Sequence, residues 1–214
     1  MKSATINRIY EKLSRSFPDA RSELSYSNNF ELLIAVMLSA QATDKIVNSV
    51  TKDLFKKYST PRGFFECGEA RLKNQIRVIG LAPTKARNII KTCGILIDKH
   101  AGEVPSTREG LEELPGVGRK TANVVLNEGF GVPTIAVDTH VFRLSNRTGL
   151  APGKSVLETE TRLLEVTPKK WLKNAHRYLI LHGRYVCKAK GFDCSGCVLV
   201  KECEYPDKVM AKNE

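Results

Sequence analysis

Residues 114–126, which read LPGVGRKTANVVL, constrain the fold of this chain more than any other stretch. Pro115 cannot continue a helix, and Gly116 and Gly118 allow positive φ angles and a close approach of the backbone to another group. After this turn, apolar residues recur at the spacing of one helical face, at Ala122, Val125 and Leu126. The stretch therefore predicts the end of one helix, a tight turn and a second helix.

The turn is also a candidate phosphate site. The first backbone N–H groups of the second helix, at Val117, Gly118 and Arg119, have no partner inside that helix and can bind an anion. Small glycines let a phosphate come close to them. Lys120 lies in the first turn, where the helix dipole disfavours a cation. From the turn alone, an ordinary surface lysine on a helix corner is an equally good interpretation.

The charge distribution indicates a polyanionic partner. Lys and Arg number 34 against 23 Asp and Glu, which gives a net charge of +11. Two stretches, residues 139–157 and 166–192, contain no acidic residue. Their basic residues are Arg143, Arg147, Lys154, Lys169, Lys170, Lys173, Arg177, Arg184, Lys188 and Lys190. A solvated face more often mixes the two signs, so we interpret these stretches as a phosphate-binding surface.

Hydropathy and length bound the class of protein. A chain of 214 residues can bury a substantial core and fits one or two domains. The first residues contain no apolar run typical of a signal peptide. The most apolar stretch, residues 32–38, is too short to span a bilayer and predicts a helix buried on all sides. We therefore expect a cytoplasmic protein, associated with the nucleoid in a bacterium.

Helical spacing of apolar residues continues along the chain, and no convincing run of alternating strand residues is present. It predicts helices at about residues 6–17, 30–39, 46–55, 64–67, 70–78, 83–97, 119–126, 139–144, 155–166 and 168–182. Thr43 or Asp44 and Ser106 or Thr107 are the expected N-caps. Gly80 is expected to end the helix of residues 70–78. The predicted fold class is all-α.

The six cysteines form two groups. Cys67 and Cys93 fall within helical patterns and are interpreted as buried apolar residues. The other four are clustered, at Cys187, Cys194, Cys197 and Cys203. In a cytoplasmic chain such a cluster indicates a metal site and not disulfides. Zinc and an iron–sulfur cluster both accept four thiolates, so these residues alone leave the metal open.

Two motifs carry a resemblance to a known family. LPGVGRKTA, at residues 114–122, resembles the helix–hairpin–helix of the DNA glycosylase superfamily. With VDTH at residues 137–140, it closely resembles the endonuclease III family, and the likeness runs from about Phe30 to the C-terminal cysteines. The resemblance implies two helical lobes with a cleft between them. One is residues 21–134, with the hairpin at about 107–130; the other is residues 1–20 with 135–214, ending in a cluster loop at 187–203.

The resemblance also implies a bifunctional enzyme, an N-glycosylase for oxidised pyrimidines in duplex DNA with abasic-site lyase activity. Lys120 matches the family's catalytic lysine, whose neutral amine attacks the sugar and forms a Schiff base that undergoes β-elimination. We expect burial, the helix N-terminus and Arg119 to lower the pKa of Lys120. Asp138 matches the catalytic aspartate. Taken alone, Asp138 is better interpreted as the N-cap of a helix beginning at Thr139, and the two roles are compatible.

Further roles rest on the same resemblance. Gln41 and Leu81 would fill the gap that an extruded nucleotide leaves, although a helix-end glutamine and a loop leucine are unremarkable on their own. Leu81 is followed here by Ala82 and Pro83, where the family often has tyrosine and asparagine. The cysteine spacing implies a 4Fe-4S cluster. The residues expected to contact DNA phosphates are Gly116, Val117, Gly118, Arg119, Lys188 and Lys190.

Two alternatives stay open at the level of sequence. The first is an adenine glycosylase of the mismatch-repair type, which usually lacks the lysine and carries a further C-terminal domain. The second is a zinc-stabilised helix–hairpin–helix module that binds DNA without catalysis. The preferred interpretation is a monomer that acts on double-stranded DNA with a damaged base or an abasic site. It involves neither a membrane nor a nucleotide cofactor.

Overall fold

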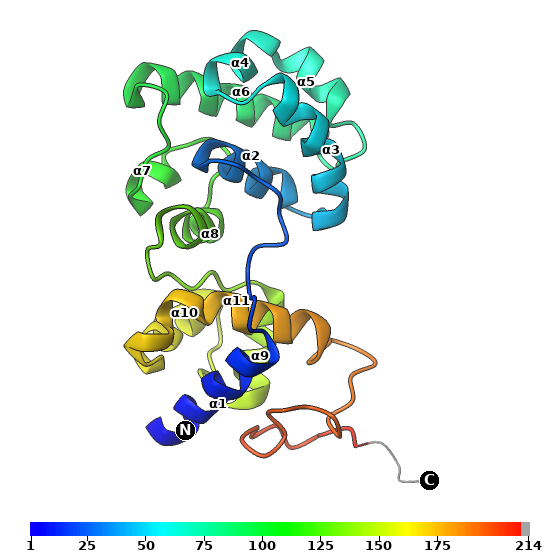
Figure 1. The fold of residues 1–214 in the computed structure, drawn as a ribbon, viewed down its shortest axis with the longest axis vertical. Coiled ribbons are helices and arrows are strands. Elements are labelled where there is room, and N and C mark those ends of the chain that lie inside the picture. The colour runs from blue at the N-terminus through cyan, green and yellow to red at the C-terminus, as the bar shows by residue number, and fades with distance from the viewer. Residues whose placement is uncertain (211–214) are drawn as a thin grey trace. The chain divides into compact units, whose positions relative to one another are not determined.

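The computed structural model describes residues 1–210, which contain eleven α-helices and no β-strand (Figure 1). The helices are α1 (Ser3–Ser16), α2 (Asn29–Ser39), α3 (Asp44–Lys57), α4 (Pro61–Cys67), α5 (Glu69–Gln75), α6 (Ala82–His100), α7 (Arg108–Glu112), α8 (Arg119–Phe130), α9 (Thr139–Thr148), α10 (Val156–Val166) and α11 (Lys169–Tyr185). The predicted all-α fold class is therefore confirmed. Among the described residues, none of the helices combines the length and apolar character needed to cross a membrane.

The chain divides into two compact units. Unit 1 comprises Met1–Arg21 with Pro133–Glu214, and unit 2 comprises Ser22–Val132. Each unit has its own cluster of buried apolar side chains. Near Pro133 the chain returns to the unit that holds α1, so each core is built from its own set of helices.

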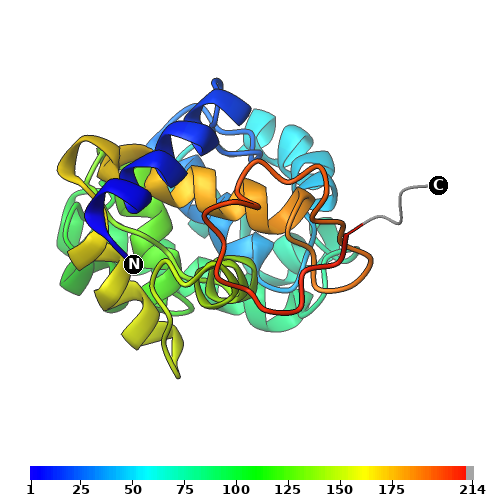
Figure 2. The ribbon, with the colours of Figure 1, turned by 90° about the horizontal axis from the view of Figure 1, so that it is seen from below.

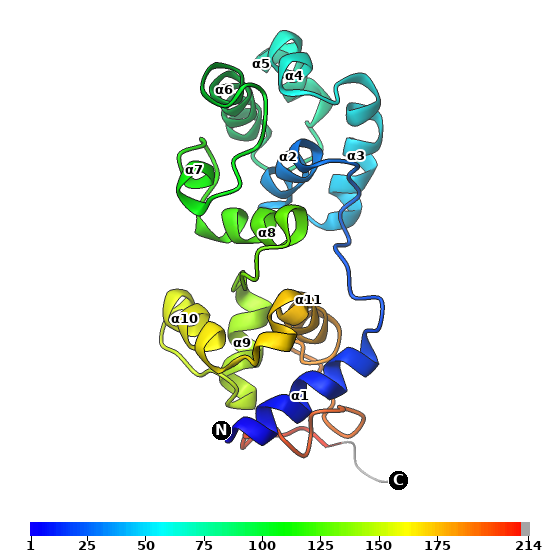
Figure 3. The same ribbon diagram turned by 60° about the vertical axis from the view of Figure 1, so that its left-hand side comes forward.

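Unit 2 is organised around α2. Nine consecutive residues of this helix, from Phe30 to Leu38, are buried, which confirms the prediction of a helix covered on all sides. It packs against α3, α6 and α8, and Figure 3 shows α2 in the middle of this unit. Asn28 caps the helix by accepting a hydrogen bond from the Glu31 N–H.

Unit 1 is built from α1, α9, α10 and α11. The apolar face of α1 is buried against α11, as its helical spacing predicts. The Tyr10 hydroxyl lies 2.8 Å from Thr167 Oγ1, and burial raises the pKa of this phenol. After α11 the chain continues as an irregular, non-helical loop, drawn in orange and red in Figure 2. This loop carries the four clustered cysteines.

The helix caps follow the sequence with one exception. Thr43 caps α3 and Thr107 caps α7, each accepting a backbone N–H. The prediction that Gly80 ends the helix of residues 70–78 is wrong, since α5 ends at Gln75. Ile76 and Ile79 are both buried, and the Ile79 N–H donates to the Ile76 carbonyl at 2.8 Å. The chain thus forms a turn at residues 76–79, which buries both isoleucines and ends the helix before Gly80.

Candidate functional site

The turn between α7 and α8 is anchored by the apolar side chain in its middle. Val117 is buried, and its N–H donates to the Leu114 carbonyl at 3.0 Å, so the expectation of a free N–H at this residue is wrong. Gly116 has φ +82°, and a Cβ there would lie 2.8 Å from Asn88 Nδ2. Glycine is therefore required at this position both by conformation and by space.

Gly118 serves the turn differently. Its φ of −97° is extended, as an N-cap residue requires, so the positive φ that glycine allows is used at Gly116 and not here. A Cβ on Gly118 would meet no atom of the described residues within 4 Å. Among those residues, no side chain caps α8, and the first turn of the helix has no acidic residue. The N-terminus of α8 is therefore open to an anion.

Lys120 is exposed in the first turn of α8, next to the exposed Arg119. The predicted burial of Lys120 is thus wrong for the protein without DNA. The reason lies in the helix face: Ala122 and Val125 point into the core of unit 2, and Lys120 lies on the other side. The helix N-terminus and Arg119 are present as expected.

Asp138 is the N-cap of α9, as predicted. Its Oδ1 accepts hydrogen bonds from the His140 N–H at 2.8 Å and the Val141 N–H at 2.9 Å. The preceding residues 135–137 are buried, so the backbone that leads to the carboxylate is held in the core of unit 1. A half-buried carboxylate with two fixed N–H donors has a defined position.

Gln41 and Leu81 share an uncommon backbone conformation. Within the described residues three non-glycine residues have positive φ, and these two are among them, with values of +56° and +63°. Both are exposed, Leu81 by 55%. A Cβ on Gly80 would lie 3.9 Å from the Gln41 carbonyl oxygen, so the two turns adjoin within unit 2. Sequence offers no signal for this conformation, because it normally belongs to glycine.

The four clustered cysteines line one pocket. Its walls also include Leu144, Leu199 and His182. Burial raises the pKa of the Cys197 thiol, and charge on the neighbouring cysteines raises it further. Among the described residues no group of three or more His, Cys, Asp or Glu lies close enough together to hold a single metal ion.

The pocket carries polar groups directed at sulfur. Arg147 Nη1 lies 3.6 Å from Cys187 Sγ, and His182 Nε2 lies 3.5 Å from Cys197 Sγ. Burial lowers the pKa of His182 to about 4, so the ring is neutral near pH 7. Four thiols, apolar walls and N–H donors to sulfur are the surroundings that an iron–sulfur cluster uses. The residues present therefore fit such a group.

Two arginines of α9 hold the loop that begins at Cys187. Arg143 Nε donates to the Cys187 carbonyl at 3.0 Å, and Arg147 Nη1 donates to the Lys188 carbonyl at 2.7 Å. Two loop aromatics enclose the Arg147 guanidinium, which lies 4.1 Å from the centre of the Phe192 ring and 5.1 Å from that of Tyr205.

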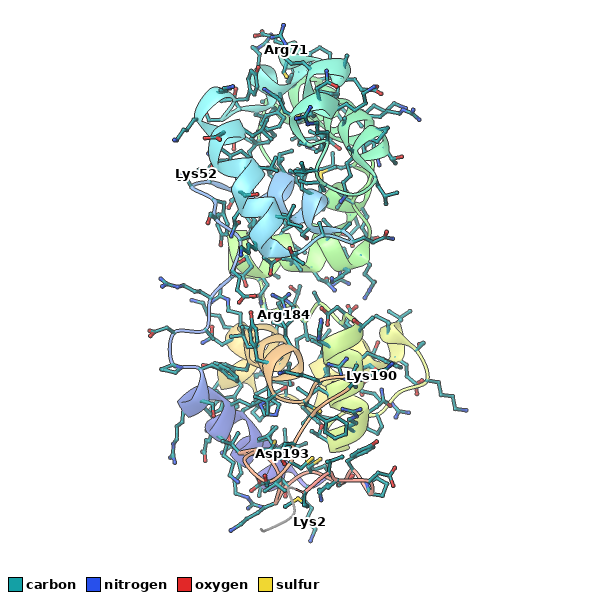
Figure 4. All side chains as sticks on the ribbon, turned by 90° about the vertical axis from the view of Figure 1, so that its right-hand side faces the viewer. Lys2, Lys52, Arg71, Arg184, Lys190 and Asp193 are labelled. Atoms are coloured by element: carbon teal, nitrogen blue, oxygen red, sulfur yellow. The ribbon has the colours of Figure 1, made fainter. Side chains whose placement is uncertain are left out.

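The charge pattern of the sequence predicts phosphate contacts for both arginines and gives no sign of these bonds to the loop. Lys188 and Lys190 are exposed on this loop, and Figure 4 labels Lys190.

Comparison with known proteins gives one family. The model of HhH-GPD superfamily base excision DNA repair proteins matches residues 34–169. Endonuclease III of Escherichia coli is 52% identical over 209 residues, which cover 98% of this chain and 99% of the relative. Endonuclease III of Haemophilus influenzae is 54% identical over 201 residues, covering 94% and 95%.

Solved structures agree with the sequence relatives. A trapped covalent intermediate of endonuclease III with DNA superposes with a TM-score of 0.90 at 50% identity, covering 95% of this chain and 96% of that one. A non-covalent endonuclease III–DNA complex gives the same values. A thermostable thymine-DNA glycosylase shares the fold at 20% identity and a TM-score of 0.84. The chain therefore belongs to the endonuclease III family of base excision repair enzymes, which are bifunctional DNA glycosylases and abasic-site lyases.

Proposed function

We propose that this chain removes oxidised pyrimidines from double-stranded DNA and cleaves the resulting abasic site through a Schiff base on Lys120. The observation that carries the proposal is the N-terminus of α8. Within the described residues no side chain caps this helix end, and the primary amine of Lys120 lies in its first turn. The surroundings of the nearby Gly118 leave room for a phosphate. A trapped covalent DNA intermediate of a relative at 50% identity supports the same chemistry.

The first step displaces the damaged base. The glycosidic bond between the sugar C1′ and the base breaks, and the base leaves with the electron pair and takes up a proton. The Nζ of Lys120 forms the new bond to C1′. In this proposal the Asp138 carboxylate stabilises the positive charge on the sugar and accepts a proton from the attacking amine.

The second step cuts the strand. The sugar ring opens to give a Schiff base between Lys120 and C1′, and a proton then leaves C2′ while the C3′–O3′ bond breaks. This is β-elimination, which releases the 3′ phosphate side as the leaving group. Water afterwards hydrolyses the Schiff base and regenerates the amine.

DNA itself would complete the surroundings of Lys120. The side chain is exposed without DNA, so a bound strand would remove water from the amine. The helix N-terminus and the Arg119 side chain lie beside this amine. A phosphate on the N–H groups of Gly118 and Arg119 would fix the strand against the turn, and the glycines at 116 and 118 keep the approach unobstructed.

The exposed side chains of Gln41 and Leu81 would enter the duplex. Extrusion of the target nucleotide leaves a gap and an unpaired base on the opposite strand. Leucine can fill the gap with apolar surface, and glutamine can hydrogen-bond the unpaired base. Their adjoining turns in unit 2 support this assignment.

A 4Fe-4S cluster would be held by Cys187, Cys194, Cys197 and Cys203, and when bound it supplies the bonds that order the loop. Arg147 and Arg143 fix the backbone between the first two cysteines, so that Lys188 and Lys190 would face DNA phosphates. We further propose that the enzyme acts as a monomer in the bacterial cytoplasm, where it associates with the nucleoid.

Borohydride trapping tests the proposal. Wild-type protein is incubated with a duplex that carries one abasic site, and borohydride reduces any Schiff base to a stable adduct. We expect an adduct with wild type and with the exposed-lysine control Lys73→Gln, and none with Lys120→Gln. Undiminished adduct with Lys120→Gln, or none with wild type that binds the duplex, would contradict the proposal.

A further inference from the structure

Lys85 is a buried cation that the proposed chemistry does not use. Its residue exposure is 7%, and it lies in the first turn of α6. A lysine this buried is rare unless its ammonium group is paired or hydrogen-bonded. Lys85 Nζ donates to the Leu38 carbonyl at 2.8 Å and to the Ala40 carbonyl at 2.6 Å.

The two acceptors are carbonyls at the end of α2. The last carbonyls of a helix have no partner inside it, and a cation there also interacts favourably with the helix dipole. Ser39 uses its carbonyl for the Ala42 N–H at 3.0 Å. Lys85 supplies the donors for the carbonyls on either side of Ser39. A side chain of α6 therefore caps the C-terminus of α2.

This cap joins the two turns that would enter DNA. Gln41 directly follows Ala40, whose carbonyl Lys85 holds. Leu81 directly precedes α6, and its carbonyl accepts the backbone N–H of Lys85 at 3.0 Å. Lys85 thus bonds to the Gln41 turn through its side chain and to the Leu81 turn through its backbone N–H. Both turns keep a non-glycine residue at positive φ, a conformation that persists only where the surrounding structure supports it.

We infer that Lys85 is a positioning residue that fixes Gln41 and Leu81 relative to each other, so that both side chains enter the duplex together. The inference rests on the proposed roles of these two residues. Methionine has a similar length and apolar stem but has no N–H to donate. The exchange Lys85→Met would therefore leave the end of α2 without its cap and let the Gln41 turn move away from Leu81.

The test compares four proteins with the iron–sulfur loop intact: wild type, Lys85→Met, Lys85→Arg and the control Lys91→Met, an exposed lysine on the same helix. Single-turnover cleavage is measured on a duplex with one abasic site. 2-Aminopurine opposite the site reports whether the opposite base is unstacked. For Lys85→Met we expect cleavage slower by about 10- to 100-fold and a smaller fluorescence change, with Lys85→Arg recovering part of both.

A double-mutant cycle separates positioning from general damage. On a Gln41→Ala, Leu81→Ala background, Lys85→Met should slow cleavage little further, because the side chains that it positions are already absent. The inference would be overturned if Lys85→Met and Lys91→Met gave equal cleavage rates and equal fluorescence changes. It would also be overturned if Lys85→Met slowed cleavage as much on the Gln41→Ala, Leu81→Ala background as in the wild type. If Lys85→Met does not fold, Lys85→Arg is measured instead on the wild-type and double-alanine backgrounds. Its effect on cleavage should again be small when Gln41 and Leu81 are absent. Failure of the proposed function is distinct, because wild type would then show no cleavage.

Discussion

The hairpin turn of unit 2 and the cysteine loop of unit 1 both carry residues proposed to meet DNA phosphates, yet different interactions hold them. The hairpin is fixed by a buried valine, backbone hydrogen bonds and one glycine at positive φ. The start of the loop is held by hydrogen bonds from Arg143 and Arg147, and the four thiols line one pocket. The hairpin anchor is apolar and forms with the fold itself, whereas the loop relies on charged side chains and, in our proposal, on a bound cluster.

The largest effect is expected at Asp138, which is the N-cap of α9 and the proposed catalytic carboxylate. Asparagine also caps helices well, so Asp138→Asn should keep the fold of unit 1. It lacks the carboxylate charge, and we expect single-turnover base removal to fall by roughly 100-fold or more. Rapid-quench kinetics and thermal unfolding are measured on the same protein. Wild-type rates in this variant would limit Asp138 to capping.

Cys194→Ser should affect the loop and spare the hairpin. With three thiolates left, we expect loss of the brown colour and iron of the purified protein, and weaker binding to an abasic duplex. Circular dichroism should retain the helices of unit 2, since no cysteine ligand lies there. Full DNA affinity after this exchange would refute a structural role for the cluster. If the purified wild-type protein is colourless and contains zinc, the four cysteines hold zinc and not an iron–sulfur cluster.

Two glycines of the hairpin separate folding from binding. Gly116→Ala should destabilise the protein by about 1–2 kcal/mol, because alanine resists φ +82° and its Cβ would meet Asn88. Gly118→Ala should cost less than about 1 kcal/mol yet weaken duplex binding about tenfold, since its Cβ would occupy the approach of the phosphate. Chemical denaturation and fluorescence anisotropy measure the two quantities. The reverse pattern would contradict the phosphate site.

The smallest effect is expected for the exposed lysines of the loop. Lys188→Ala and Lys190→Ala should each reduce the slope of log affinity against log salt by about 0.9, because one phosphate contact is lost. Lys73→Ala, an exposed lysine of α5, is the control. A slope unchanged by both loop variants would show that the loop does not meet the DNA backbone.

The sequence predicts most of the helices because one buried face of a helix repeats every three or four residues. It also predicts the Asp138 cap and the tight turn that contains Gly116, which depend on neighbours in the chain. The roles of Arg147 and Lys85 are not predictable in this way. Their partners lie about 40 or more positions away, and bonds between a side chain and a distant carbonyl leave no periodic pattern. The exposure of Lys120 likewise follows from which face of α8 meets the core.

Peptide mapping of the borohydride-trapped adduct tests the central claim most directly. The wild-type adduct is digested with nuclease and protease, and mass spectrometry locates the lysine that carries the sugar remnant. We predict a single modified site at Lys120. A remnant on another lysine or on the N-terminal amine, with Lys120 unmodified, would contradict the assignment of the nucleophile to the N-terminus of α8.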